Sequence, residues 1–205
     1  MSRYTGPVNK KSRRYNFSIL ENNKEFERNK KKVNPPGQHG AKRVKLSEYG
    51  LQLREKQKVK FMYGLNERQM INTFKKSKLI KTNILGVNFL IMLESRLDNI
   101  VYRLGLSNTR RGARQLVNHK HILVNKKCIN IPSYICKVND EITLKEKSKK
   151  LKVVTDSIKN HYTTLKFVRF NKTNFLGTYL RNPLRSELNQ EINEALIIEL
   201  YNRII

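Results

Sequence analysis

Apolar residues in the middle of the chain recur at the spacing of one helical face. They are Leu90, Leu93, Leu97, Ile100, Val101 and Leu104. Residues three, four and seven positions apart lie on the same side of a helix, and Gly105 follows as a natural stop. The pattern therefore predicts a single core helix that ends at Gly105.

A second helix is predicted from Arg110 to about His119, because Ser107, Asn108 and Thr109 offer N-cap groups and only Gly112 interrupts the pattern. At about 100° per residue, the polar side chains share one arc and the small and apolar ones share the other. The polar arc holds Arg110, Arg111, Arg114, Gln115 and Asn118, and the packing arc holds Gly112, Ala113, Leu116 and Val117. We expect the first arc to be a cationic face.

Short β-strands follow these helices. Residues 122 to 124 and 128 to 131 flank a turn at 125 to 127, which predicts a hairpin with two lysines at its turn. Residues 142 to 144 resemble another strand, and residues 167 to 179 carry β-formers around a polar centre, as in a second hairpin. The middle of the chain is thus predicted to be a small α+β unit.

The N-terminal segment is polar and interrupted. Gly6-Pro7, the lysine run at 30 to 32 and Pro35-Pro36-Gly37 argue against any long regular element in the first 45 residues. These residues also include anchors that a solvated tail does not need, namely Tyr4, Tyr15, Phe17, Ile19, Leu20 and Phe26. We expect an extended basic arm that orders on RNA, with aromatic rings that pack or stack on bases.

Helices are predicted on both sides of Gly64. Ser47 is a suitable N-cap for a helix that runs through Phe61, with Leu51, Arg54, Lys58 and Phe61 on one side. That helix lies either between RNA strands or in solvent. Asn66 and Gln69 resemble a capping box for the next helix, whose terminal lysines at 75 to 78 suit the helix dipole. The apolar end, residues 192 to 201, is expected to return and pack on another part of the protein.

Three arginines in the first turns of the second helix oppose the helix dipole. Cations held there on a defined face suggest an anionic partner, and the guanidinium fork suits phosphate oxygens. The alternative is a solvated surface helix. Glu94 and Asp98 stand one turn apart with like charge, and an arginine from the second helix could relieve that repulsion. These two acids are expected to be structural rather than catalytic.

Composition favours nucleic acid as the partner. The chain has 43 Lys and Arg against 16 Asp and Glu, a net charge of +27 in 205 residues. Residues 1 to 90 hold 22 basic and 6 acidic side chains, and residues 91 to 150 hold 13 and 5, which predicts two separate binding surfaces. No apolar run approaches the roughly 18 residues of a membrane span, and no signal peptide is evident. Two cysteines, Cys128 and Cys136, fit a reducing compartment.

Enzyme and metal functions find little support in the sequence. No glycine-rich phosphate loop, HExxH or G-x-S-x-G motif is present, and isolated acids such as Asp98 or Asp156 form no catalytic constellation. The nearest metal candidate is His119 and His121 with Cys128, which offers one usable thiol. We expect no enzyme, no metal and no cofactor. His119 is better interpreted as an RNA-facing donor and Cys128 as part of a strand.

Several motifs resemble the S-four RNA-binding domain. They are Leu93-Glu94-Ser95-Arg96-Leu97-Asp98-Asn99, Val101-Tyr102-Arg103, Thr109, Ala113-Arg114-Gln115-Leu116-Val117, His119 and Val124-Asn125. That domain also occurs in pseudouridine synthases, tyrosyl-tRNA synthetases and a heat-shock ribosome-rescue protein. The flanks resemble bacterial-type small-subunit ribosomal protein S-four, at Ser2 to Pro7, Pro35-Pro36-Gly37-Gln38-His39-Gly40, Leu51-Gln52-Leu53-Arg54-Glu55-Lys56-Gln57-Lys58, Ile192-Asn193-Glu194 and Ile198-Glu199-Leu200-Tyr201. The resemblance covers essentially the whole chain.

This resemblance implies an α+β architecture: a mostly helical N-terminal domain completed by the C-terminal end, with an inserted S-four domain of two helices and a small β-sheet. The implied boundaries are an arm at 1–45, a helical domain at 46–88 completed by 186–205, and an S-four region at 89–185 with its core at 93–150. Some family members hold zinc with four cysteines in the arm. No cysteine precedes Cys128 here, so that site is not expected.

The resemblance also implies a cytoplasmic ribosomal protein, bacterial or organelle-encoded, that binds the 5′ domain of small-subunit rRNA, nucleates subunit assembly and supports translational accuracy near the mRNA entry path. Neighbouring small-subunit proteins are the other expected partners, with no membrane and no homo-oligomer. The alternative is an S-four-domain rescue factor or an accessory protein of RNA modification. A modification enzyme would need a separate catalytic domain, for which the chain has no room.

The residues expected to contact RNA form two groups. From the inserted domain they are Arg110, Arg111, Arg114, Gln115, His119, Asn125 and Lys126, and from the other domain Arg3, Arg13, Arg14, Gln38, His39, Arg54 and Lys58. Phosphate contacts should dominate, with recognition by RNA shape. Reversing Arg110, Arg111 and Arg114 to Glu is expected to weaken binding and to leave the circular-dichroism spectrum unchanged.

Overall fold

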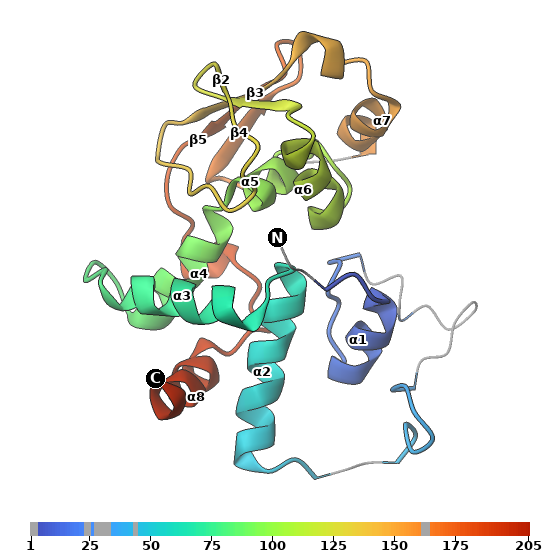
Figure 1. Cartoon of the computed structure of the whole chain (residues 1–205), viewed down its shortest axis with the longest axis vertical. Helices are drawn as coiled ribbons and strands as arrows, with labels where there is room; N and C mark the ends of the chain where they lie inside the picture. The colour runs from blue at the N-terminus through green and yellow to red at the C-terminus, as the bar shows by residue number, and fades with distance from the viewer. Residues whose placement is uncertain (1–3, 23–25, 27–33, 43–44, 161–164) are drawn as a thin grey trace. The chain divides into compact units, whose positions relative to one another are not determined.

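The computed structural model describes residues 4–22, 26, 34–42, 45–160 and 165–205. The chain divides into two compact units, one of residues 1–88 and 190–205 and the other of residues 89–189 (Figure 1). The described helices of the first unit are α1 (Val8–Tyr15), α2 (Glu48–Met62), α3 (Glu67–Lys78) and α8 (Glu194–Ile204). Helix α4 (Leu85–Glu94) begins in the first unit and ends in the second.

Helix α2 contacts both α1 and α8. The buried residues of α2 are Gln52, Lys56, Val59 and Met62, whereas Leu51 is 45% exposed. The side of α2 that packs on the protein is therefore not the one that carries Leu51, Arg54, Lys58 and Phe61. Polar side chains occupy the packed side because their partners come from other helices: Gln52 Nε2 donates to Glu199 on α8 (3.0 Å), and Lys56 Nζ donates to Glu67 on α3 (2.7 Å).

The predicted helix boundaries around Gly64 are confirmed. Ser47 Oγ accepts the backbone N–H of Gly50 (3.2 Å) at the start of α2, and Gly64 adopts a left-handed φ of +63° after its end. Asn66 and Gln69 form the capping box in both directions, at 2.9 and 3.1 Å. Local chemistry alone was sufficient to predict these features.

The N-terminal segment contains a helix that the sequence analysis did not predict. Helix α1 begins after Pro7 and ends at Asn16, whose φ of +47° is left-handed. Phe17 and Ile19 beyond it are buried, at 2% and 3% exposure, which confirms that this segment has apolar anchors. The expectation of an extended arm is wrong for residues 8–15, while the lysine run at 30 to 32 lies outside the described residues.

Aromatic residues join this helix to α2. The Phe61 ring lies 5.0 Å from the Tyr4 ring and 5.9 Å from the Tyr15 ring, and Lys11 Nζ lies 5.0 Å from the Phe61 ring centroid. These rings pack on protein, so base stacking is not their role in this conformation. Phe26 is partly buried, but its neighbouring residues lie outside the described part of the chain.

The C-terminal helix completes the first unit, as the apolar pattern of residues 192 to 201 predicts. Tyr201 is fully buried, its ring centroid lies 4.8 Å from that of Phe74, and its hydroxyl donates to Glu67 Oε1 (3.3 Å). Burial raises the pKa of Tyr201 far above its ordinary value, so the phenol stays a hydrogen-bond donor. Helices α2, α3 and α8 thus meet around one glutamate.

Stability of the first unit should depend on the ionisation of Glu67. Burial raises the pKa of Glu67, but hydrogen bonds from Lys56 and Lys60 outweigh it, so the pKa lies below the ordinary 4.5. A lowered folded-state pKa gives stability that is present above the unfolded value and is lost as pH falls through the folded one. We expect denaturant midpoints to fall below about pH 4.5 and Glu67→Gln to flatten that dependence; an identical pH profile for both proteins contradicts this role.

The single core helix predicted for residues 90 to 104 is interrupted. Helix α4 ends at Glu94 and α5 (Leu97–Arg103) begins after Arg96, whose φ and ψ of −67° and 140° are extended. Arg96 forms an antiparallel bridge with Ile135, and Ser95 O accepts the N–H of Cys136 (2.8 Å). A distant segment therefore pairs with the backbone at the break. The prediction of one helix is wrong because periodicity reports the buried face and not such pairing.

The second unit places helices against an antiparallel sheet in the order β2-β1-β3-β5-β4. The strands are β1 (Ile122–Val124), β2 (Lys127–Cys128), β3 (Glu141–Leu144), β4 (Val168–Asn171) and β5 (Leu176–Tyr179), and the remaining helices are α6 (Arg110–Asn118), α7 (Lys152–Asn160), η2 (Glu146–Ser148) and η3 (Arg185–Glu187). Both predicted hairpins and the strand at 142 to 144 are confirmed. Helix α7 was not predicted.

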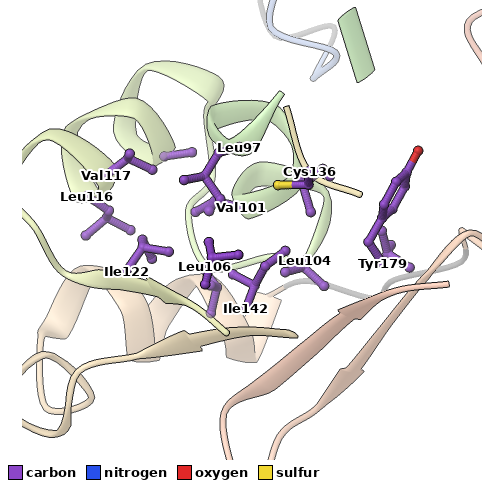
Figure 2. Packing of buried hydrophobic residues seen from close by; sticks show 14 of the residues in the cluster. Leu97, Val101, Leu104, Leu106, Leu116, Val117, Ile122, Cys136, Ile142 and Tyr179 are labelled. Atoms are coloured by element: carbon purple, nitrogen blue, oxygen red, sulfur yellow. The ribbon is translucent and has the colours of Figure 1, made fainter. Parts of the chain in front are cut away.

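One hydrophobic core holds this unit together (Figure 2). Leu97 and Val101 of α5 and Leu104 at its C-cap share this core with the strand residues Ile122 and Ile142, and all five are at most 1% exposed. Ile142 pairs with Gly177 across β3 and β5, and a Cβ at Gly177 would overlap the Leu104 side chain. The bare glycine lets α5 approach the sheet. No helix among the described residues has the length and apolarity of a membrane span.

Candidate nucleic-acid interface

Helix α6 has the boundaries that the sequence predicts. Thr109 Oγ1 accepts the N–H of Gly112 (3.1 Å) at its start, and Lys120, with a left-handed φ of +61°, follows its end. A Cβ at Gly112 would overlap Ser107 Oγ, which explains the glycine inside the helix. Local capping therefore fixes where α6 begins and ends.

The rotation of α6 differs from the predicted arcs. Ala113, Leu116 and Val117 are buried as expected, but so is Arg114 at 6% exposure, and only 10% of the Arg110 side chain is exposed. The exposed residues of this helix and its C-cap are Arg111, Gln115, Asn118 and His119. The expectation that all three arginines face solvent is wrong for Arg110 and Arg114, since both turn inward.

Glu94 provides the internal partner for two arginines. It is 1% exposed and accepts hydrogen bonds from Arg103 Nε (3.0 Å), Arg103 Nη2 (2.9 Å) and Asn99 Nδ2 (2.7 Å). Arg110 Nη2 lies 3.8 Å from the same carboxylate, and Arg110 Nε donates to Asn99 Oδ1 (2.8 Å). The Arg110 guanidinium also lies 4.6 Å from the centroid of the Tyr102 ring.

Asp98 forms a second cluster one turn away. It accepts two hydrogen bonds from Arg96, at 3.0 and 2.7 Å, and Arg114 Nη1 lies 3.6 Å from its Oδ2. The prediction that an arginine from α6 relieves the charge of these acids is confirmed for both carboxylates. Two of the three arginines that suggested an anionic partner therefore have carboxylates of the protein itself as neighbours. Reversing Arg110 and Arg114 is now expected to disrupt the fold, contrary to the unchanged spectrum first expected.

The hairpin turn beside α6 is tighter than predicted. Asn125 and Lys126 both have left-handed φ, +48° and +65°, as in a two-residue type I′ turn, so Lys127 already belongs to β2. The Asn125 side chain donates to Asp140 Oδ1 (2.9 Å) and accepts the N–H of Glu141 (2.9 Å). Asn125 therefore ties the turn to β3, while Lys126 at the tip is exposed.

Polar residues connect α6 to both the hairpin and the segment after β3. Cys128 Sγ lies 3.7 Å from Lys120 O, and His121 O accepts the N–H of Lys145 (3.0 Å). His121 Nδ1 lies 2.8 Å from Ser148 Oγ. Burial, followed by the nearby His119 and Lys145, lowers the pKa of His121, so this imidazole is neutral at pH 7.

The segment after β3 carries lysines that were not among the predicted RNA contacts. These are Lys145, Lys147, Lys149, Lys150 and Lys152. Ser148 within this segment and Val154 just beyond it are buried, and three of the lysines are exposed. Five lysines within eight residues, against Glu146 alone, were the available signal. The contacts of His121 with Lys145 and Ser148 join this segment to the end of α6. We use the name α6 surface for the exposed edge of α6, His119 to His121, Lys126 and these lysines.

The first unit brings together four of its predicted RNA contacts. Arg13 Nη1 donates to Asn34 O (3.2 Å) and Arg14 Nη2 donates to Pro36 O (3.0 Å), which holds the loop of residues 34–42 against α1. This loop and α1 line a pocket of about 580 Å³. The pocket residues include Lys10, Arg13, Gln38 and Gly40, and His39 beside them is exposed.

The other predicted contacts of this unit are less available. Lys58 is ion-paired with Glu55 (2.5 Å), and Arg54 is half-buried, so neither lies on a free cationic face of α2. Arg3 lies outside the described residues. The structure therefore shifts the candidate surface of this unit from α2 toward the loop of residues 34–42.

Cysteine and histidine chemistry adds no further site within the described ranges. Cys128 is exposed and Cys136 is buried, and both are free thiols. Burial raises the pKa of the Cys136 thiol, so it is a poor nucleophile. Among the described residues, no three His, Cys, Asp or Glu side chains are grouped as a metal site would require.

Comparison with known proteins identifies the family. Residues 3–94 match the model described as ribosomal protein S4/S9 N-terminal domain, and residues 95–142 match the S4 domain. The chain is 58% identical to small ribosomal subunit protein uS4 of Mesoplasma florum, with all of both chains covered, and 59% identical to that of Mycoplasma capricolum, with 99% of that protein covered. Identity to the Streptococcus mutans protein is 50%, again over both whole chains. The chain therefore belongs to the uS4 family of small ribosomal subunit proteins.

Proposed function

We propose that this protein is a structural constituent of the small ribosomal subunit that binds its rRNA through the α6 surface and the loop of residues 34–42. The observation that carries this proposal is the exposed edge of α6 and its C-cap, which presents an arginine, two amides and an imidazole to solvent. These groups donate to phosphate and sugar oxygens, and none requires a particular base.

The two surfaces suit a partner that is long and highly charged. Each lies in a different unit of a chain with net charge +27, and a long RNA offers many phosphates for each of them. Counterion release from several phosphates then supplies most of the affinity. The pocket beside Arg13 and Gln38 is large enough for a phosphate group and is lined by cationic and backbone groups.

The finer role follows from the family resemblance. We infer binding to the 5′ domain of the rRNA, a role in nucleating subunit assembly, a position near the mRNA entry path, and contacts with neighbouring ribosomal proteins that support accuracy. The protein then works on the cytoplasmic ribosome, without enzymatic activity, membrane contact or homo-oligomer formation. A rescue factor or modification accessory is not favoured, since the matches to uS4 proteins extend over the whole chain.

A competition experiment tests this function. The purified full-length protein is titrated with the 5′ domain of small-subunit rRNA at salt concentrations from about 50 to 200 mM, in the presence of tRNA or unrelated duplex RNA. Tight binding that survives both competitors supports a primary rRNA binder. Binding that every competitor removes equally leaves a generic basic protein and restores the rescue-factor alternative.

Charge reversal on the α6 surface should weaken this binding without unfolding the protein. We expect Arg111→Glu combined with Lys126→Glu to reduce affinity at least about 10-fold and to lower the salt slope by about one per lost phosphate contact. Both side chains are exposed, so the circular-dichroism spectrum should not change.

The matched control changes the same net charge elsewhere in the unit. Lys159→Glu combined with Lys172→Glu alters two exposed lysines outside the α6 surface. Equal loss of affinity in the two double variants would mean that overall charge, and not the α6 surface, determines binding.

A further inference from the structure

The buried carboxylates of Glu94 and Asp98 lie beside α6 and bear on how this helix is rotated about its axis. We propose that Glu94 and Asp98 are positioning residues for RNA recognition, acting through Arg110 and Arg114. This inference rests on the proposed function, because it explains how the α6 surface is oriented toward the rRNA. Neither carboxylate contacts RNA itself, since their side chains are 1% and 7% exposed.

The contacts place one anchor on each of two successive turns of α6. Arg110 reaches Asn99 and Glu94, and Arg114, four residues later, reaches Asp98. Two anchors on one face of a helix fix both its rotation and its position along its axis. The apolar contacts of Ala113, Leu116 and Val117 favour burial of that side but are not directional.

The partners of Arg110 hold its guanidinium on several sides. Asn99 bridges the cluster, because its Nδ2 donates to Glu94 (2.7 Å) while its Oδ1 accepts from Arg110 Nε (2.8 Å). The ring of Tyr102 lies 4.6 Å away on another side. The Arg110 side chain therefore links α6 to α5 in one defined position.

Rotation of α6 has a direct consequence for the RNA surface. Neighbouring residues of a helix differ by about 100° in direction, so a shift of one position would move Arg114 to the exposed place of Gln115 and Arg111 to the partly buried place of Gly112. Buried ion pairs add little net stability compared with apolar packing of the same volume, and fixing register is their best attested use. A buried ion-pair cluster in place of apolar packing is therefore explained if its role is to fix the direction of Arg111, Gln115 and His119.

The test uses full-length protein and the same rRNA and competitors, with Glu94→Gln as the main variant. Glutamine keeps the shape of the side chain but removes the charge that Arg103 and Arg110 share. We expect about 10-fold weaker binding to the 5′ domain at a temperature where hydrogen exchange shows the variant folded. In a double-mutant cycle, Arg111→Gln should cost less affinity in the Glu94→Gln background than in the wild type, because Arg111 is no longer aimed at the RNA.

Two further variants keep the test decisive. If Glu94→Gln does not fold, Arg110→Lys takes its place. Lysine retains the positive charge but lacks the planar guanidinium that reaches Asn99 and Glu94 together. This variant should show the same non-additivity with Arg111→Gln. Glu187→Gln is the control, since Glu187 on η3 pairs with Arg181 (2.6 Å) in the same unit and with no arginine of α6, and it should leave binding unchanged.

The outcomes separate this inference from the function on which it rests. A wild-type protein that does not prefer the 5′ domain overturns both. A selective wild type, with Glu94→Gln and Arg110→Lys showing unchanged affinity and full additivity with Arg111→Gln, overturns the positioning role alone and leaves Glu94 a stabilising residue. Weaker binding together with the non-additive cycle supports the positioning role, because a purely stabilising residue would not alter the Arg111 effect.

Discussion

Replacing Glu94 with alanine is expected to lower the free energy of unfolding of the second unit by about 3–5 kcal/mol, the usual cost of removing one partner of a buried ion pair. The variant leaves the guanidinium of Arg103 without the carboxylate that accepts two of its hydrogen bonds and leaves Arg110 without its nearest anion. It also removes an acceptor from the Asn99 side chain. Urea denaturation combined with hydrogen exchange across residues 89–189 measures the loss.

An exposed ion pair in the same unit provides the comparison. Glu146 is 85% exposed in its pair with Lys149, and Glu146→Ala should change stability only slightly because solvent screens that interaction. Similar losses for Glu94→Ala and Glu146→Ala would show that the buried cluster contributes no more than a surface pair. That result would also remove the physical basis for the proposal that Arg110 fixes the rotation of α6.

Local chemistry made much of α2, α3 and α6 predictable. Ser47, Asn66 and Thr109 are N-caps whose side chains bond backbone N–H groups three residues later, and Gly64 ends its helix region with positive φ. Each signal operates within about four residues of sequence, so no tertiary information is needed to interpret it. The turn after Val124 was predicted in the same way, but as residues 125 to 127, whereas the structure forms it from Asn125 and Lys126 alone.

The break at Arg96 was not predictable from periodicity. Both α4 and α5 bury the same stripe, which includes Leu93 and Leu97, so the pattern continues through the interruption. The interruption depends on pairing with Ile135, almost forty positions later in the sequence. Long-range pairing of this kind leaves no trace in a local window.

The candidate site was predicted correctly in its elements and incorrectly in the direction of its side chains. A 100° wheel placed Arg114 and Arg111 in one arc, yet Arg114 is buried against Asp98 and Arg111 is exposed. The wheel sorts residues by polarity, so it cannot recognise a charged side chain whose counter-ion is buried on a neighbouring helix. The like charges of Glu94 and Asp98 were the signal that such counter-ions exist, and they predicted the internal pairing. The lysines after β3 lie in a short segment without helix or strand periodicity, so no face of a regular element marked them in the sequence.

Loss of the Tyr201 ring should destabilise the first unit selectively. Tyr201 on α8 is fully buried, packs on Phe74 at 4.8 Å and donates to Glu67, so one side chain links the C-terminal helix to the N-terminal helices. We expect Tyr201→Ala to lower the free energy of unfolding by about 3–5 kcal/mol, the range for deleting a large buried aromatic group. Hydrogen exchange should quicken in α2, α3 and α8 and change little in β1, β3 and β5, because the two units have separate cores.

Two variants on the same helix separate the ring from the hydroxyl and from helix formation. Tyr201→Phe keeps the ring and should cost only about 1 kcal/mol for the lost hydrogen bond. Ile204→Ala alters a residue that is 55% exposed and should have a much smaller effect. If all three variants were equally stable, α8 would not be part of the first unit's core, and the C-terminal end could not complete the domain that the N-terminal helices begin. Faster exchange in both units would instead mean that the two cores unfold together. The stability of the second unit would then depend on the packing of Tyr201 in the first.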